Sequence, residues 1–588
     1  MQIPGFLWPL ALAIPLLLAA AVMPKASRSS ALALAPLAAL PALGLALLAE
    51  PGEASGVEIP WLIFGTSLGL NTTTRVFLVF TALLWTLAGL YARSYLKGDE
   101  QEHRFFAFYL VTMTGNLGLI LARDLASFYF LFTLMSLAAY GLVVHEGTDK
   151  ARYAAKVYLI LAILGEAFIL PAVLITAATT GSNELEDVAA GVAASPARDA
   201  IIFLALVGFG VKAGSLLPLH VWLPLAHPAA PTPASAVLSG TMIKAGLLGW
   251  MLFLPVGEAE LPEWGAFILA AGLIAAFYGV AVGLTQEAPK TILAYSSISQ
   301  MGFLTVSVGA GLFAPSSWPV ALAAVVVYAT HHALAKGALF LGVGVAEKTE
   351  GSRRRWQRLL VLAGLLLAAL AIAAAPLTSG AAAKEYLKSA AELTPYYDVL
   401  SMLLDIATVG SALLLTRFLL FVRPHAGNEE KDPGAGLWMP WAVTIGGVAT
   451  LILFFPDPIS ELAGLVLSFS ALWPVLAGAL LAGGAWLLDR RSGGKVRMKI
   501  EPRIPEGDLL IPFTWLLGGL RWGWNAYALP ARERAAELLS TQARRSRSGL
   551  GKLSSAATKL ESRMQFWTVA GGLSLLVAIA LLALTALT

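Results

Sequence analysis

Long apolar windows recur along the whole chain, and they constrain its fold more than any other feature. Each window is close to twenty residues long, the length at which an α-helix crosses the hydrocarbon core of a bilayer. The sequence therefore predicts an all-α polytopic membrane protein with about sixteen transmembrane helices. The expected spans are 4–22, 31–49, 75–95, 104–122, 124–144, 153–178, 199–226, 233–255, 263–284, 290–313, 318–345, 357–394, 396–423, 437–455, 459–487 and 566–587.

Composition agrees with this class and excludes several kinds of chemistry. Of the 588 residues, 58% are hydrophobic and 13% are charged, so a soluble fold would leave too much apolar surface in water. The chain has no cysteine and cannot hold thiolate-bound iron–sulfur clusters or disulfides. We expect no cofactor and no metal, with any redox chemistry in partner subunits. The net charge of +4 is too small and too scattered to predict nucleic acid as a partner.

Basic loops alternate with acidic or neutral ones, as the positive-inside rule requires. Acidic connections lie at 50–60, 181–191 and 257–263. The pattern places both termini outside, in a multi-pass protein of a bacterial inner (plasma) membrane. The basic positions are Lys25, Arg28, Arg93, Lys97, Arg104, Lys150, Arg152, Lys156, Lys348, Arg353, Arg354, Arg355, Arg490, Arg491, Lys495 and Arg497.

Residues 488–565 form a long stretch without a predicted span. Its first part is apolar and rich in tryptophan, and its second part is basic and compatible with helix. We expect a lateral amphipathic and basic segment on the cytoplasmic face, followed by a terminal transmembrane helix at 566–588. The alternative is a loosely ordered basic linker to the last helix.

Four lysines, Lys212, Lys244, Lys336 and Lys384, fall inside predicted spans. A charge at the bilayer centre costs at least about 2.5–3.5 kcal/mol, so such lysines face a water-filled cavity or a carboxylate. In these surroundings a lysine can exchange protons. The four residues are therefore candidates for a proton path. The alternative for any one of them is a fixed ion pair that holds two helices together.

Helix breakers interrupt two of the spans. Pro218 and Pro224 lie in the seventh span, and Pro376 and Gly380 lie in the twelfth. Broken helices at corresponding positions of two halves mark a transport pathway, and two successive five-helix sets must have opposite orientations. The expected organisation is three N-terminal helices in 1–100, a first inverted repeat in 101–255, a second in 256–423, helices 14 and 15 in 424–487, the lateral segment in 488–565 and the terminal helix in 566–588.

Acidic residues in neighbouring spans are candidate partners for the lysines. Glu166 lies one span before Lys212, and we expect an ion pair that opens and closes with proton movement. A permanent counter-ion is the alternative role for Glu166. Asp405 is expected to pair with Lys384.

Four histidines near the breaks, His220, His227, His331 and His332, are candidates to carry protons, because imidazole titrates near neutral pH. Their spacing fits no familiar zinc or copper motif. The alternative is that each one binds a carbonyl group freed by a helix break.

Four motifs resemble a known family. They read "GFGVKAGSLLPLHVWLPLAHPAAPTPASAVLSGTMIKAG", "KTILAYSSISQMGF", "HHALAKGALFLGVG" and "PLTSGAAAKEYLK". They are similar to the antiporter-like membrane subunits shared by respiratory complex I, the Mrp cation/proton antiporters and energy-coupled membrane hydrogenases. The similarity covers about residues 60 to 420. It implies a 14-helix core of two inverted five-helix repeats with helices 7 and 12 broken, together with a lateral amphipathic helix and a final anchoring helix.

The resemblance also implies roles for individual residues. Lys212 matches the lysine of the broken seventh helix, and Lys244 matches the central lysine of the eighth. Lys336 matches the lysine of the helix that begins with a histidine motif, and Lys384 matches the twelfth-helix lysine near the exit. The four histidines fall in the same motifs, where they relay protons or organise water.

Two positions depart from the family pattern. The fifth helix of the family usually carries a glutamate after an aromatic residue, and here Thr133 occupies that position. Leu225 stands where another acid is expected. We hypothesise that Lys212 uses Glu166 instead. The alternative is a member of the family that no longer pumps by the usual switch.

The resemblance implies a proton-translocating component of a multisubunit, Mrp-type cation/proton antiporter. Its partners would be other membrane subunits, lipid and protons, with exchange of Na⁺ or K⁺ left open. Two alternatives stay open: a pump subunit in the membrane arm of a complex I-like oxidoreductase or membrane hydrogenase, and a membrane subunit of an inorganic-carbon uptake system. In each case the chain is a transporter subunit without a redox centre of its own.

Overall fold

The structure is a computed structural model that describes residues 3–52, 56–425, 427, 432–455, 469–491 and 504–510. The chain divides into two compact units. The first comprises Met1–Glu58 and Ser67–Glu506 and holds all the helices named below. The second comprises Ile59–Thr66 and Gly507–Thr588, of which 59–66 and 507–510 are described. The predicted terminal helix at 566–588, and most of the predicted lateral segment, lie outside the described residues.

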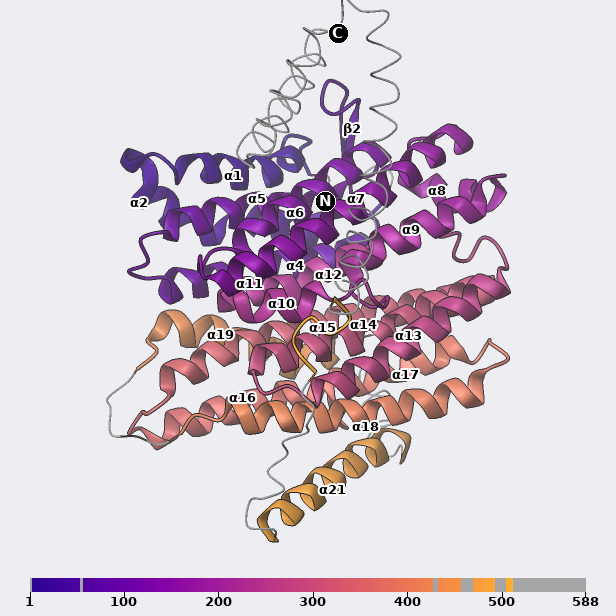
Figure 1. The fold of residues 1–588 in the computed structure, drawn as a ribbon. Coiled ribbons are helices and arrows are strands. Elements are labelled where there is room, and N and C mark those ends of the chain that lie inside the picture. The colour runs from indigo at the N-terminus through magenta and orange to yellow at the C-terminus, as the bar shows by residue number, and fades with distance from the viewer. Residues whose placement is uncertain are drawn as a thin grey trace, which may run out of the picture. The chain divides into compact units, whose positions relative to one another are not determined.

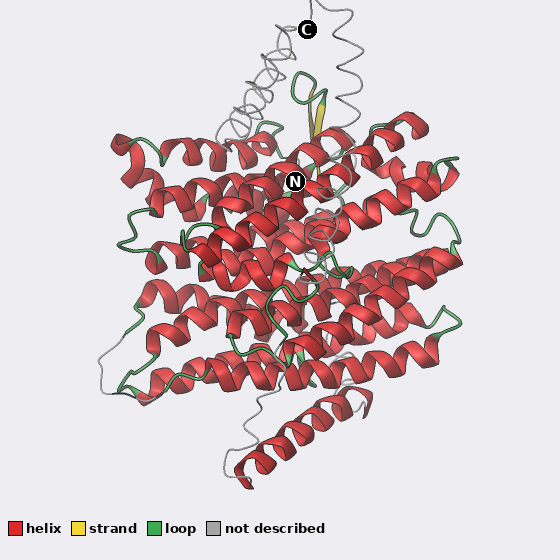
Figure 2. Ribbon diagram, viewed as in Figure 1, coloured by secondary structure: helices red, strands yellow, loops and turns green. Residues whose placement is uncertain are grey.

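The first unit is built almost entirely of helices that run alongside one another (Figures 1 and 2). Strands β1 (Gly56–Ile59) and β2 (Thr66–Gly69) form a small two-stranded sheet. The N-terminal helices are α1 (Leu7–Ala21), α2 (Lys25–Leu34), α3 (Leu40–Leu48) and α4 (Thr72–Tyr95). The span expected at 31–49 is divided by a 3₁₀ turn, Ala35–Leu37, because Pro36 and Pro41 remove helical N–H donors.

The next helices include the first break. They are α5 (Glu102–Leu121), α6 (Leu125–Val143), α7 (Asp149–Thr180), α8 (Leu185–Ala194), α9 (Arg198–Ala213), α10 (Trp222–Ala229), α11 (Thr232–Val237) and α12 (Ile243–Phe253). The seventh expected span ends at Gly214, whose φ of +70° lies in the left-handed region that glycine adopts without strain. The chain then resumes as α10, so this helix is broken as expected. The short helix α8 was not predicted from the sequence.

The second half contains the other break. Its helices are α13 (Pro262–Gly283), α14 (Pro289–Phe313), α15 (Trp318–Thr349), α16 (Arg355–Ile372), α17 (Ser379–Ala391), α18 (Tyr397–Val422), α19 (Ala435–Thr450) and α21 (Phe469–Arg491). The twelfth expected span consists of α16 and α17. Between them Ala374 and Leu377 have φ values of 55° and 66°, a conformation that costs a non-glycine residue about 1–3 kcal/mol.

Twelve helices in the described part of the chain are long and apolar enough to cross a membrane. The expected count was about sixteen. The difference arises because α1 has 15 residues, both broken helices consist of short pieces, α21 is apolar only over Leu472–Gly484, and 566–587 is not described. The multi-pass, all-α class is confirmed, and the count of sixteen is not.

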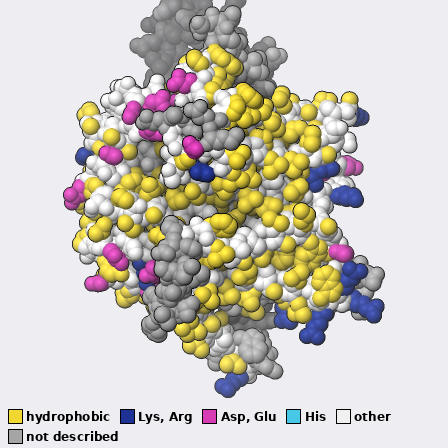
Figure 3. Space-filling view, turned by 180° about the vertical axis from the view of Figure 1, so that it is seen from behind, with side chains coloured by type: hydrophobic (Ala, Val, Ile, Leu, Met, Phe, Trp, Pro, Cys, Tyr) yellow, Lys and Arg dark blue, Asp and Glu magenta, His cyan; other side chains and the backbone are white. Residues whose placement is uncertain are grey.

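Charged side chains separate along the helix direction. On the face drawn in Figure 3, Lys and Arg side chains gather mainly at one end of the helices and most Asp and Glu side chains lie towards the other. This distribution matches the alternation of basic and acidic loops.

The core of the unit lies around α14 and the α11–α12 segment. The apolar window of α14 is completely buried, and that of Thr232–Phe253 is 94% buried. Close packing with α13 depends on small residues: a Cβ on Gly272 or Gly279 would lie 2.7 or 2.6 Å from a backbone oxygen of α14. Because α14 is buried on all sides, its polar side chains can contact only other protein groups.

Candidate functional site

All four lysines predicted inside the membrane are buried in protein. Lys212 is 5% exposed, Lys244 1%, Lys336 0% and Lys384 5%. None of them faces the lipid. Each ammonium group must therefore find its partners among side chains and carbonyls of the neighbouring helices.

Lys212 lies in the last turn of α9, immediately before the break. Its Nζ donates a hydrogen bond of 2.9 Å to Tyr158 Oη, and Tyr158 in turn donates to the carbonyl of Ser136 at 2.6 Å. The same ammonium lies 5.0 Å from the centre of the Tyr158 ring and 5.6 Å from that of Trp222. Two electron-rich rings and a hydroxyl thus hold the charge in place of water.

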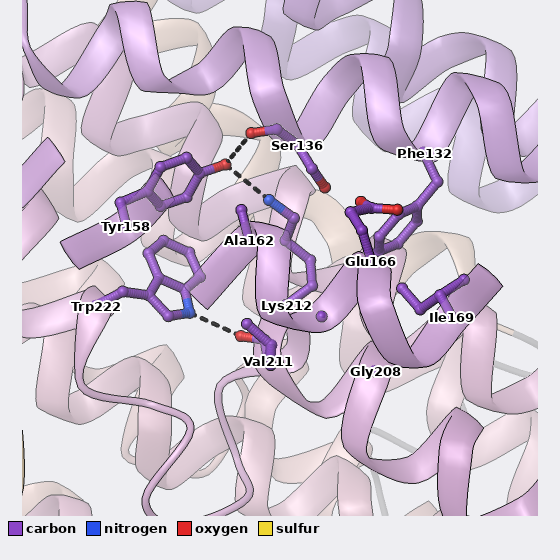
Figure 4. A pocket seen from close by; sticks show the side chains of 11 residues that line it. Phe132, Ser136, Tyr158, Ala162, Glu166, Ile169, Gly208, Val211, Lys212 and Trp222 are labelled. Atoms are coloured by element: carbon purple, nitrogen blue, oxygen red, sulfur yellow. Dashed lines mark hydrogen bonds between the residues drawn. The ribbon is translucent and has the colours of Figure 1, made fainter. Parts of the chain in front are cut away.

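Glu166 faces the same cavity from α7 (Figure 4). Its Oε2 accepts a hydrogen bond of 2.7 Å from Thr133 Oγ1, the residue that stands where the family glutamate was expected. The cavity is lined by Lys212, Glu166, Tyr158, Trp222 and seven further residues, and it leaves about 10 Å³ to the centre of a water molecule, close to what one water needs. Lys212 and Glu166 thus share a cavity, although Lys212 Nζ donates to Tyr158 rather than to the carboxylate.

Lys244 lies next to a distortion of its helix. Residues Leu238–Met242 form a π-helical turn, a feature often found at functional sites, and Lys244 Nζ donates to the carbonyl of Ser239 within this turn at 2.7 Å. The same Nζ lies 2.6 Å from Nδ1 of His332 on α15. An ammonium and an imidazole in contact can pass a proton between them.

Two further contacts extend from α15. Lys336 Nζ donates to the carbonyl of Leu293 on α14 at 2.9 Å. His331 Nδ1 lies 2.9 Å from Ser379 Oγ, at the first residue of α17. The adjacent histidines of α15 therefore join the helix of Lys244 on one side to the second broken helix on the other.

A cluster of three charged residues, the Asp405 triad, lies where α17 meets α18. Asp405 Oδ1 is 2.6 Å from Lys384 Nζ and 2.8 Å from Lys388 Nζ. All three residues are buried. The sequence predicted the pair of Lys384 with Asp405 and missed Lys388, although a spacing of four residues places both lysines on one face of α17.

The other two histidines have different surroundings. The His227 ring stacks on Phe340 with 4.6 Å between ring centres, and the His220 ring lies 5.2 Å from that of Tyr278. Both are buried. Within the described residues, no group of three or more His, Cys, Asp or Glu side chains is arranged to hold a metal ion.

Sequence reasoning also missed neutral groups that link the helices. Tyr158 is one; Gln300 of α14 is another, since it accepts from Tyr328 at 2.7 Å and donates to Ser411 of α18 at 3.1 Å. Gln300 lies in the motif "SSISQMGF", so a polar side chain in an apolar span was the available signal. Tyr158 gave no such signal, because tyrosine is common in apolar spans.

Broken helices, buried lysines and a many-helix fold define a class of membrane transport protein. The family described as NADH:quinone oxidoreductase/Mrp antiporter, TM, matches residues 122–419, just over half of the chain. The chain belongs to this family.

Similar proteins agree with this assignment. Hydrogenase-4 component B of Escherichia coli K12 is 30% identical over 295 residues, covering 48% of this chain and 44% of that protein. A protein of Rhizobium meliloti, named as a probable K(+)/H(+) antiporter component, is 31% identical over 409 residues, covering 65% and 40%. The chain thus spans less than half the length of either relative.

A solved structure shows the same fold. A chain in the structure of the Mrp complex from Dietzia sp. DQ12-45-1b aligns with a TM-score of 0.71 and 22% identity. The alignment covers 91% of this chain and 63% of that one.

Proposed function

We propose that this chain is a proton-translocating component of a multisubunit, Mrp-type cation/proton antiporter in a bacterial inner (plasma) membrane. Lys212 with Glu166 gates the inner half-channel, Lys244 relays protons, and Lys384 with Asp405 forms the exit. The observation that carries the proposal is that each of these three lysines contacts a group that can itself hold a proton: Tyr158, His332 and Asp405.

Glu166 takes the place of the family glutamate in this scheme. The hydroxyl of Thr133 fixes the Glu166 carboxylate at the edge of the cavity that Lys212 also lines. A water molecule in the cavity, or a rotation of the flexible lysine side chain, is enough to join the two charges. An ion pair that is not locked in direct contact suits a group that must open and close during transport.

Family membership and the relatives support the same scheme. The Rhizobium relative bears an antiporter name, and the Dietzia chain comes from an Mrp complex. Other membrane subunits are therefore the proposed partners, with protons and either Na⁺ or K⁺ as the transported ions. We further assign 101–255 and 256–423 as the two inverted repeats, supported by the breaks between α9 and α10 and between α16 and α17.

Transport in everted membrane vesicles tests the proposal, with the full chain expressed beside the products of its neighbouring genes. Lys244→Met and Lys212→Met should each lower cation-driven proton movement by about 10²-fold or more, the usual loss for a proton-transfer group. Lys97→Met, in an exposed loop, is the matched control and should transport normally. Normal transport by both buried-lysine variants, at normal assembly, would refute the proposal.

A second function is favoured by one specific observation, the similarity to hydrogenase-4 component B. In that case the same lysines would serve a pump in the membrane arm of a redox complex. Subunits that co-purify with the chain distinguish the two functions. Small multispan antiporter subunits support the first, and iron–sulfur or flavin proteins support the second.

A further inference from the structure

Lys388 has no role in the scheme described above, yet its surroundings are as specialised as those of Lys384. It lies on α17 one turn after Lys384 and is 5% exposed. Its Nζ is 2.8 Å from the same carboxylate oxygen of Asp405 that Lys384 approaches to 2.6 Å. One oxygen atom therefore receives two ammonium groups.

The charges of this triad do not balance when both lysines are protonated. Two ammonium groups and one carboxylate carry a net charge of +1, in a buried place where water screens it weakly. The other acidic side chains of α17 and α18 and of the loop between them, Glu385, Glu392 and Asp398, are exposed. Asp405 is therefore the only buried acid on these two fully described helices, and losing one proton makes the triad neutral.

The direction of α17 gives the two lysines different positions along the path. The helix begins at Ser379, directly after the break and beside His331, and ends at Ala391. At 1.5 Å per residue, Lys388 lies about 6 Å further along the helix axis than Lys384. This is the end opposite to the basic start of α16 at Arg355, and exposed residues of the following loop lie one turn beyond it.

We infer that Lys388 is a second proton-carrying lysine, which passes protons between Lys384 and the outer aqueous phase through Asp405. The inference rests on the proposed function and adds a residue to its exit step. Lys384 starts as an ammonium and Lys388 as a neutral amine. An N–H bond of Lys384 breaks, the proton rests on the Asp405 carboxylate, and a new N–H bond forms at Lys388. No electron is transferred, and the charge of the triad is unchanged until Lys388 releases the proton to water.

A purely structural role for Lys388 makes different predictions. A fixed ammonium that only braces α17 against α18 would be needed for assembly, and its own titration would not matter. Lys388→Arg keeps the charge but does not release a proton at working pH, because the guanidinium is effectively always protonated. Lys388→His keeps a group that exchanges protons, with an ordinary pKa about 4 units below that of lysine.

Proton transport in everted vesicles, measured across a range of pH with normal chain levels, separates these roles. Lys388→Arg should assemble but lose at least about tenfold in rate. Lys388→His should retain more activity than Lys388→Arg, with its pH optimum moved to lower pH. The inference is overturned if Lys388→Arg transports normally, or if Lys388→His is as impaired as Lys388→Arg with an unchanged pH profile.

Lys244→Met, measured in parallel, distinguishes failure of this inference from failure of the proposed function. If Lys244→Met abolishes transport while Lys388→Arg transports normally, only the role of Lys388 is wrong. If both variants transport normally, the proposed function itself fails.

Discussion

Thr133 and Glu166 show how a proton site can move from one helix to the next. The hydroxyl of Thr133 cannot replace the charge of a glutamate, but it donates a hydrogen bond of 2.7 Å to the carboxylate that α7 supplies. The acid therefore remains at the cavity of Lys212 while its backbone attachment changes from α6 to α7. The chemistry that Lys212 requires is an acid within reach, and either helix can provide it.

This arrangement predicts a graded effect of two substitutions. Glu166→Gln removes the charge and should lower transport by about 10²-fold. Thr133→Val removes one hydrogen bond to a carboxylate, worth about 1.5–3 kcal/mol, and should lower transport roughly tenfold. Rates of proton movement in vesicles provide the measurement.

Thr86→Val serves as the control for the threonine substitution, because Thr86 is buried and binds only the carbonyl of Ala82 in its own helix, α4. It should transport normally. A larger loss for Thr133→Val than for Glu166→Gln would contradict the assignment of Glu166.

At the scale of helices, the packing of α12 against α9 brings the Lys212 and Lys244 segments together. Gly246, two residues after Lys244, lies so close to α9 that an added Cβ would be 2.5 Å from the nitrogen of Ala213 and 2.5 Å from the oxygen of Phe209. Backbone atoms cannot move aside as a side chain can. The glycine is therefore required by the helix crossing rather than by its own φ angle.

Gly246→Ala should accordingly destabilise the protein by roughly 1–3 kcal/mol, through forced separation of the two helices. Gly446, in α19, is the matched control, since an added Cβ there meets nothing within 4 Å. Gly446→Ala should leave stability unchanged or raise it slightly, because alanine favours helix by about 1 kcal/mol over glycine. Thermal unfolding in detergent compares the two variants, and equal melting temperatures would contradict the close packing.

For the whole molecule, orientation in the membrane follows from the separation of charges along the helices. The loop between α4 and α5 lies at the basic end, and the loop between α12 and α13 is acidic. Residues 504–506 also bind at the basic end: Glu506 Oε2 is 2.8 Å from Lys150 Nζ, and its Oε1 accepts a hydrogen bond of 3.0 Å from Thr291 Oγ1. This contact agrees with a cytoplasmic position for the start of α7 and α14.

Single cysteines test this orientation directly, because the chain contains none of its own. Glu100→Cys and Glu260→Cys both lie at exposed positions, in the α4–α5 and α12–α13 loops respectively. A membrane-impermeant maleimide should label position 260 in intact cells and position 100 only in everted vesicles. The reverse labelling would invert the orientation and exchange the inner and outer half-channels.

The sequence by itself determined the membrane class, most of the helices, both helix breaks and the buried lysines. These features follow from hydropathy, from proline and glycine, and from the high cost of a charge in lipid, all of which act locally along the chain. Only the tertiary structure decided which groups each lysine contacts. Tyr158 beside Lys212, and Lys388 sharing Asp405 with Lys384, depend on how distant helices rotate and approach one another. Packing of whole helices sets these contacts, and no local pattern of residues encodes it.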